Sequence, residues 1–131
     1  NLAEGSTLTA DYCKDDRHTA QMALDPDPTH YWHSGAFSKP VEFILDLGEA
    51  FDVNKVVLKE HIATGQQIEK FSLWWDSNLP GEGAPKWERL ASETVIGYKR
   101  ICRFDERRLQ RLKLVLEEVR GFATLEAFEA Y

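Results

Sequence analysis

The sequence predicts an antiparallel β-sandwich of two sheets. Short segments rich in β-branched and aromatic residues recur along the chain, and turn signals separate them at regular spacing. Within residues 41–47, Val41, Phe43, Leu45 and Leu47 face one way and Glu42, Ile44 and Asp46 the other, as in a strand with one buried face. About eight such segments and only one convincing helix favour a sandwich over an α/β fold.

The first third of the chain contains one expected strand and the one expected helix. Residues 7–10 form the strand, and a short helix covers residues 19–24. We expect Asp15 or Asp16 to cap this helix, since aspartate accepts hydrogen bonds from the first exposed N–H groups. The Asp-Pro-Asp-Pro run at residues 25–28 ends it, because proline disfavours helix both at its own position and at the preceding one.

A central pair of strands, residues 56–62 and 68–75, is joined by a turn that contains Gly65. Glu60, His61, Gln66 and Gln67 gather where these strands meet, and this polar mouth is a candidate ligand site. The other expected strands are 41–47, 87–91, 99–104, 111–117 and 125–131, with connections at 48–51, 78–85, 105–110 and 118–124.

One segment permits a second interpretation. The segment 106–120 is long enough, and rich enough in charged residues, to form a helix. Leu112, Leu114 and Leu116, however, recur at every second position, which favours a strand.

Size and charge exclude several classes of protein. The 131 residues suit a single domain. A net charge of −6 argues against a nucleic-acid partner and against attraction to anionic membranes. No apolar run approaches the roughly 20 residues of a membrane-spanning helix, so we expect no membrane insertion.

Two features bear on the origin of the chain. Cys13 and Cys102 are too few for a disulfide framework; one bridge is possible, and two free thiols are the simpler interpretation. The chain begins at Asn1 without a signal peptide, so we interpret residues 1–131 as one module excised from a longer polypeptide.

Several motifs together resemble the discoidin, or factor V/VIII type C, domains, a group that includes the family 32 carbohydrate-binding modules. They are Asn-Leu-Ala at 1–3, Tyr31-Trp32, Val-Glu-Phe at 41–43, Asp-Leu-Gly at 46–48 and Leu-Glu-Ala-Phe at 125–128. Residues 58–71 and 96–104 further resemble the C-terminal accessory domain of family 29 α-L-fucosidases. The resemblance implies a galactose-binding-like jelly roll, appended to a catalytic domain in the same polypeptide, in an extracellular or periplasmic location.

The resemblance also implies a structural calcium site. Asp25 and Asp27 lie in a stiff turn, and calcium prefers the oxygen ligands that such a turn supplies. By analogy with the family, the ligands would be the Leu24 and His30 carbonyls, Asp25, Asp27 and Glu126. His30 stands where the family usually has threonine, so an acidic turn without metal is the alternative. Zinc at His30 and His33 lacks further ligands at recognised spacing.

A carbohydrate ligand is the partner that the resemblance implies. His61 matches a histidine of the sugar-binding modules, whereas Gln66 stands where they usually have arginine. Aromatic rings in loops could pack on sugar C–H groups, while we expect Trp32 to be a buried anchor. The candidate sugar-binding residues are His33, Phe37, His61, Gln66, Tyr98, Arg100 and Phe122.

The sequence does not predict an enzyme. No pair of carboxylates stands in a recognised catalytic context, and no nucleophile or phosphate-binding motif occurs. We therefore expect a non-catalytic carbohydrate-binding module. The alternative is a structural domain that packs on a fucosidase catalytic domain and binds no sugar, with Glu60, His61, Gln66 and the Tyr98–Arg100 run at the interface.

Overall fold

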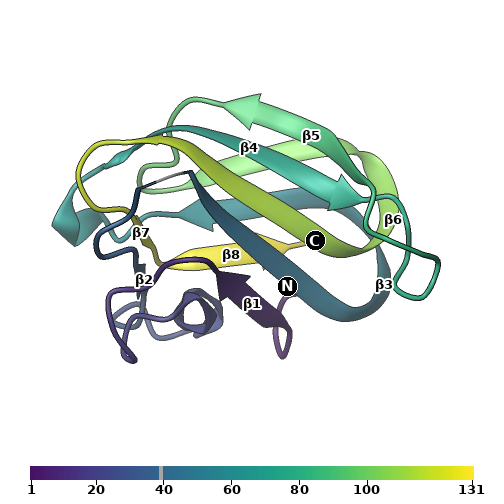
Figure 1. The fold of residues 1–131 in the computed structure, drawn as a ribbon, viewed down its shortest axis with the longest axis horizontal. Coiled ribbons are helices and arrows are strands. Elements are labelled where there is room, and N and C mark those ends of the chain that lie inside the picture. Colours follow the sequence, from purple (N-terminus) through teal and green to yellow (C-terminus); the bar gives the residue numbers. More distant parts are fainter. Residues whose placement is uncertain (39) are drawn as a thin grey trace.

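Two long antiparallel strands, β3 (Val41–Lys59) and β6 (Arg100–Val119), form the centre of the molecule. The structure is a computed structural model that describes residues 1–38 and 40–131. Figure 1 shows β5 at one edge of the molecule and β1 with the coil beside it at the opposite edge. The other elements are β1 (Thr7–Ala10), the 3₁₀ helix η1 (Ala20–Leu24), β2 (Trp32–His33), the 3₁₀ helix η2 (Ile62–Thr64), β4 (Ile68–Asp76), β5 (Trp87–Glu93), β7 (Thr124–Leu125) and β8 (Ala127–Ala130).

Both long strands contribute to both layers of a sandwich. Residues 41–46 of β3 pair with 111–116 of β6, in a layer that β1 extends on one side and β4 and β5 on the other. Residues 55–58 of β3 pair with 100–103 of β6 in the other layer, where β8 lies along β3. The all-β, antiparallel jelly-roll sandwich predicted from the sequence is confirmed.

The predictions of turns at residues 48–51 and 105–110 are wrong. Each lies inside a long strand, because β3 and β6 bend together instead of ending. The bend occurs at Gly48, whose φ of 85° suits a residue without a Cβ. The register shifts between Asp46 and Phe51, and the pairing then resumes with Phe51 opposite Leu109.

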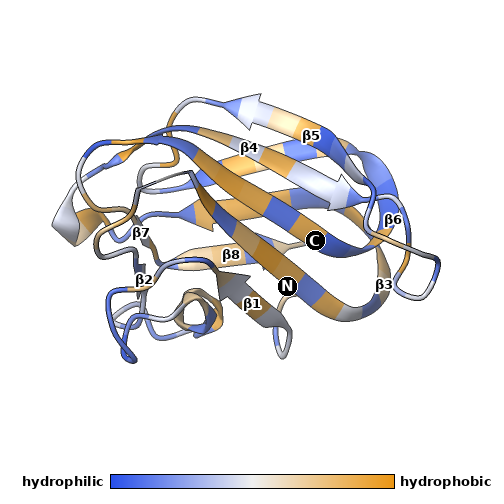
Figure 2. Cartoon of the chain, viewed as in Figure 1, coloured by the Kyte–Doolittle hydropathy of each residue, from blue (hydrophilic) through white to orange (hydrophobic). Residues whose placement is uncertain are grey.

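A single core lies between the layers. Val41, Phe43, Leu45 and Leu47 are all buried, as their alternation predicted, and Figure 2 shows such apolar bands alternating with polar ones along β3. Trp32 is fully buried, donates its indole N–H to the Tyr12 carbonyl at 2.7 Å, and meets the Phe43 ring edge-on at 4.6 Å. The prediction of Trp32 as a core anchor is confirmed.

Other local expectations need correction. The short helix is a 3₁₀ helix whose N-cap is Thr19, and Asp15 instead accepts hydrogen bonds within its own turn, from the Arg17 N–H at 2.9 Å. The segment 106–120 is strand rather than helix. The strand expected over 56–62 ends at Lys59, and the last segment divides into β7 and β8.

The expectations about the two cysteines and about membrane-spanning helices can be compared with the structure. Cys13 is exposed and Cys102 is buried, and both are free thiols. Burial raises the pKa of the Cys102 thiol to about 11, so this group stays protonated near neutral pH. Among the described residues, no helix is both long and apolar enough to span a bilayer.

Candidate functional site

Five aromatic rings from four segments form a continuous row beside the β2–β7 pair. Tyr31 stacks on His61, with ring centroids 3.8 Å apart and planes only 5° from parallel. His18 meets Tyr31 edge-on at 5.0 Å and His33 at 6.0 Å. His33 in turn lies 5.6 Å from the Phe122 ring, which is 56% exposed. The row brings together three of the predicted sugar-binding residues, His33, His61 and Phe122.

The short β2–β7 pair positions the centre of the row. Trp32 pairs with Leu125 and His33 with Thr124, and the two apolar members are fully buried. Ser34, also buried, donates its backbone N–H to the Ala123 carbonyl and accepts the Ala123 N–H on its hydroxyl at 3.0 Å. The loop that carries Phe122 is therefore tied to the strand that carries His33.

Side-chain and backbone contacts fix His61. Its Nδ1 lies 2.9 Å from the Glu126 carboxylate, and its backbone N–H donates to the Thr124 hydroxyl at 3.1 Å. A carboxylate accepts, so Nδ1 carries the proton. In the neutral imidazole, Nε2 is then a hydrogen-bond acceptor.

His33 has the opposite tautomer. Its Nδ1 accepts the Gly35 N–H at 3.0 Å, so in the neutral ring Nε2 carries the proton and is a donor. Burial lowers the pKa of His33, which favours this neutral form. With both imidazoles neutral, the row presents a donor on His33, an acceptor on His61 and the exposed ring of Phe122. Such a surface suits a ligand with an apolar face and hydroxyl groups.

The remaining predicted sugar-binding residues lie outside the ring row. Gln66 packs over Gly97, where an added Cβ would come within 3.2 Å of its Oε1. Tyr98 is 74% exposed, and Arg100 pairs with Glu93 of β5. Phe37 packs against the core and meets the Tyr12 ring at 6.2 Å.

The polar mouth of the central strand pair is largely a structural feature. Glu60, only 1% exposed, accepts the backbone N–H groups of Gln67, Ile68 and Gly97 at 2.8, 3.1 and 2.7 Å. One carboxylate thus joins the start of β4 to the loop before β6. Glu60 is consequently occupied within the protein and does not face a ligand.

Sequence reasoning missed two members of the row, His18 and Tyr31. His18 is held by Asp15, whose carboxylate lies 2.7 Å from its Nδ1. Tyr31 precedes the buried Trp32, and alternation along a strand places its ring on the opposite side. That alternation was the available signal for Tyr31. No sequence signal links His18 to residues so far along the chain.

The three carboxylates among the predicted calcium ligands, Asp25, Asp27 and Glu126, do not cluster in the structure. Asp25 accepts the Asp27 N–H at 2.9 Å and lies 2.9 Å from His30 Nδ1, and Asp27 accepts from Thr29. The bond to Asp25 raises the pKa of His30. Glu126 bonds to His61 instead. Within residues 1–38 and 40–131, no three His, Cys, Asp or Glu side chains cluster as a metal would require. Calcium at these residues stays a prediction from the family resemblance, and in this arrangement its binding would require Glu126 to leave His61.

Comparison with known proteins found a relative that is similar in sequence. The chain is 28% identical over 135 residues to a protein of Oryza sativa named putative alpha-L-fucosidase 1; the match covers all of this chain and 25% of the rice protein. The chain therefore spans about a quarter of that relative's length. No protein-family model matches it.

Two solved structures share the fold. A Ruminococcus gnavus GH29 fucosidase, solved with fucose, superposes with a TM-score of 0.88 at 22% identity, over all of this chain and 26% of that one. A Clostridium perfringens module, CpGH89CBM32-5, solved with GalNAc-β-1,3-galactose, gives 0.86 at 20% identity over 99% and 98% of the two chains. The chain is similar in fold both to part of a fucosidase and to a complete carbohydrate-binding module.

Proposed function

We propose that this chain is a non-catalytic carbohydrate-binding module that recognises a terminal sugar of a galactose- or fucose-containing glycan. The observation that carries the proposal is the ring row from His61 to Phe122. The sequence similarity to an α-L-fucosidase supports a parent glycoside hydrolase of that kind, to which this module is accessory. The proposed location, extracellular or periplasmic, rests on the family resemblance.

The chemistry of a sugar matches the row. A pyranose ring has an apolar face of C–H groups, which packs on an aromatic ring, and an edge of hydroxyls that both donate and accept hydrogen bonds. In the proposed complex the C–H face lies on Phe122. The hydroxyls bond to the donor of His33 and the acceptor of His61, each fixed by its tautomer.

A shallow site of this kind binds weakly. We expect a Kd on the order of 0.1–1 mM, since one terminal sugar buries few atoms. Attachment to an enzyme makes such binding useful, because tethering raises the effective concentration of glycan near the catalytic domain.

Calorimetry with the 131-residue chain tests the proposal. The ligands are L-fucose, D-galactose and GalNAc-β-1,3-galactose, each to about 10 mM, well above the expected Kd. We expect Phe122→Ala to weaken binding by roughly tenfold, the value of one aromatic contact. Ile101→Ala, on an exposed residue of β6, is the matched control and should bind normally. Absence of binding by the unaltered chain to all three sugars would refute the proposal.

The alternative function is a structural domain that packs on the catalytic domain. The exposure of Tyr98 favours it, since a large exposed ring next to Lys99 is available to a neighbouring domain. Glu60, which is buried and bonded within the chain, would take no part in that interface. A structure of the full-length protein decides the matter. Burial of Tyr98 against the catalytic domain, together with a covered ring row, would support this alternative over sugar binding.

A further inference from the structure

A groove with two tryptophans lies on the outer surface of the layer formed by β3, β6, β4 and β5, away from the ring row. Trp74 of β4 and Trp87 of β5 are half-buried and line it, with Val115 of β6 as the floor. Its volume is about 410 Å³, which lies in the range of small-ligand sites. Nothing in the proposed terminal-sugar site uses this groove.

The strand register explains why these residues meet. Trp74 pairs with Lys113 of β6, and Trp87 pairs with Asp76, which follows Trp74 by two residues. Side chains two apart on a strand share a face. Trp75 between them packs against the core instead, so Trp74 and Trp75 face opposite sides of the sheet.

Hydrogen bonds hold the groove side chains in place. The Trp74 indole N–H donates to the Ser72 hydroxyl at 2.9 Å, and that hydroxyl donates to Glu117 at 2.7 Å. Lys113 lies 4.6 Å from the centre of the Trp87 ring and 3.6 Å from the Glu42 carboxylate. The groove thus offers ordered aromatic surface bordered by one ammonium group and two carboxylates.

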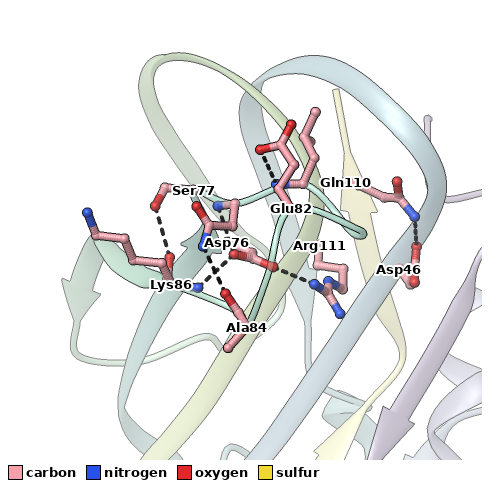
Figure 3. Close-up of polar contacts among 10 residues, drawn as sticks. Asp46, Asp76, Ser77, Glu82, Ala84, Lys86, Gln110 and Arg111 are labelled. Atoms are coloured by element: carbon pink, nitrogen blue, oxygen red, sulfur yellow. Dashed lines mark hydrogen bonds and ion pairs between the residues drawn. The ribbon is translucent and has the colours of Figure 1, made fainter.

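An ion pair between Arg111 and the buried Asp76 fixes the start of the strand that carries Trp87. Asp76, 1% exposed, accepts from Arg111 at 2.7 Å and from the backbone N–H of Lys86 and Asn78 at 2.9 and 3.0 Å. Figure 3 shows Asp76 between Arg111 and the loop that carries Lys86. Because Lys86 immediately precedes Trp87, these bonds fix the point at which β5 begins.

The groove continues at its other end. Pro40 and Glu117 also line a second hollow of about 420 Å³, with Phe37 and Val119 on its far side. Shared lining residues make the two hollows neighbours along the same face. Their linings together include the aromatic rings of Trp74, Trp87 and Phe37 and the carboxylates of Glu42, Glu117 and Glu118.

We propose that this groove is a second carbohydrate-binding site, one that holds successive sugar rings of an uncharged oligosaccharide rather than its terminus. Sugar rings pack on tryptophan, and their hydroxyls satisfy both Lys113 and the carboxylates of Glu42 and Glu117. Charges of both signs suit a neutral ligand. A protein partner is disfavoured, because charged residues are depleted at the centres of protein interfaces, whereas here they stand between the aromatic rings.

NMR of the ¹⁵N-labelled 131-residue chain tests this site. The four tryptophans give four indole N–H signals, of which Trp32 is a buried internal control bonded to the Tyr12 carbonyl. The probes are cellohexaose, xylohexaose and N-acetylchitohexaose, each to about 10 mM, with L-fucose and D-galactose for comparison. We expect at least one hexaose to shift the Trp74 and Trp87 signals while leaving Trp32 unchanged.

Variants separate the two sites. Trp87→Ala should weaken hexaose binding about fivefold or more, with Trp74→Phe as a second, better-packed variant. Phe122→Ala in the ring row should leave the hexaose shifts unchanged. If no hexaose moves Trp74 or Trp87, or if Phe122→Ala abolishes those shifts, the second site is refuted. Monosaccharide binding at the ring row is measured separately, so either site can fail without the other.

Discussion

At the scale of single residues, Glu60 shows how a polar side chain at a predicted ligand site can serve the fold instead. Sequence alone placed it in the mouth of a strand pair with His61 and Gln66. In three dimensions, it accepts three backbone N–H groups, two from the start of β4 and one from the loop before β6. A carboxylate has enough lone pairs for three such bonds, and a buried N–H without a partner is costly.

We expect Glu60→Ala to lower the free energy of unfolding by roughly 2–4 kcal/mol, because three backbone donors lose their acceptor. Glu60→Gln is the matched control. It keeps one carbonyl oxygen and the shape of the side chain, so its loss should be smaller. Urea denaturation measures both. Equal stabilities for Glu60→Ala and the unaltered chain would show that water replaces the carboxylate without cost.

The ring row shows which site residues a sequence can predict. Phe122 and His33 were predictable because an aromatic ring and an imidazole in or beside loops are available for binding. His18 was not, since its place in the row depends on contacts with Tyr31 and His33, far along the chain. Gln66 and Arg100 were named, but their local partners hold them at Gly97 and Glu93.

At the scale of elements, β3 and β6 differ most from expectation. Glycine in residues 48–51 and the charged run at 105–110 are typical of turns. The two strands instead bend side by side and stay paired on both sides of the bend. Local sequence cannot distinguish a turn from a shared bend, because the difference lies in the partner strand.

We expect Gly48→Ala to lower the free energy of unfolding by roughly 1 kcal/mol, since an L-residue is strained at a φ of 85°. An added Cβ would meet no atom within 4 Å, so the cost is one of backbone conformation rather than of crowding. Glu49→Ala, on the exposed neighbour, is the control. The midpoint of urea denaturation reports both variants, and an unchanged midpoint for Gly48→Ala would contradict this account of the bend.

At the scale of the whole molecule, calcium would join the first turn to the last strands if it bound as the family resemblance implies. In the structure Glu126 bonds to His61, and the turn at 25–30 is satisfied by its own donors. We therefore expect the melting temperature to be the same in excess EDTA and in millimolar calcium. A rise of several degrees with calcium, lost in Glu126→Gln, would mean that Glu126 leaves His61 to join the turn.

The sequence by itself determined the sandwich, the buried faces of residues 41–47 and 112–116 and the core role of Trp32, because side-chain alternation is a local property. Only the tertiary structure decided where β3 and β6 bend, that Glu60 is internal, and that rings from four segments meet in one row. It also placed Trp74 beside Trp87 on the outer face. Each of these depends on strand register, which brings residues together across long stretches of chain.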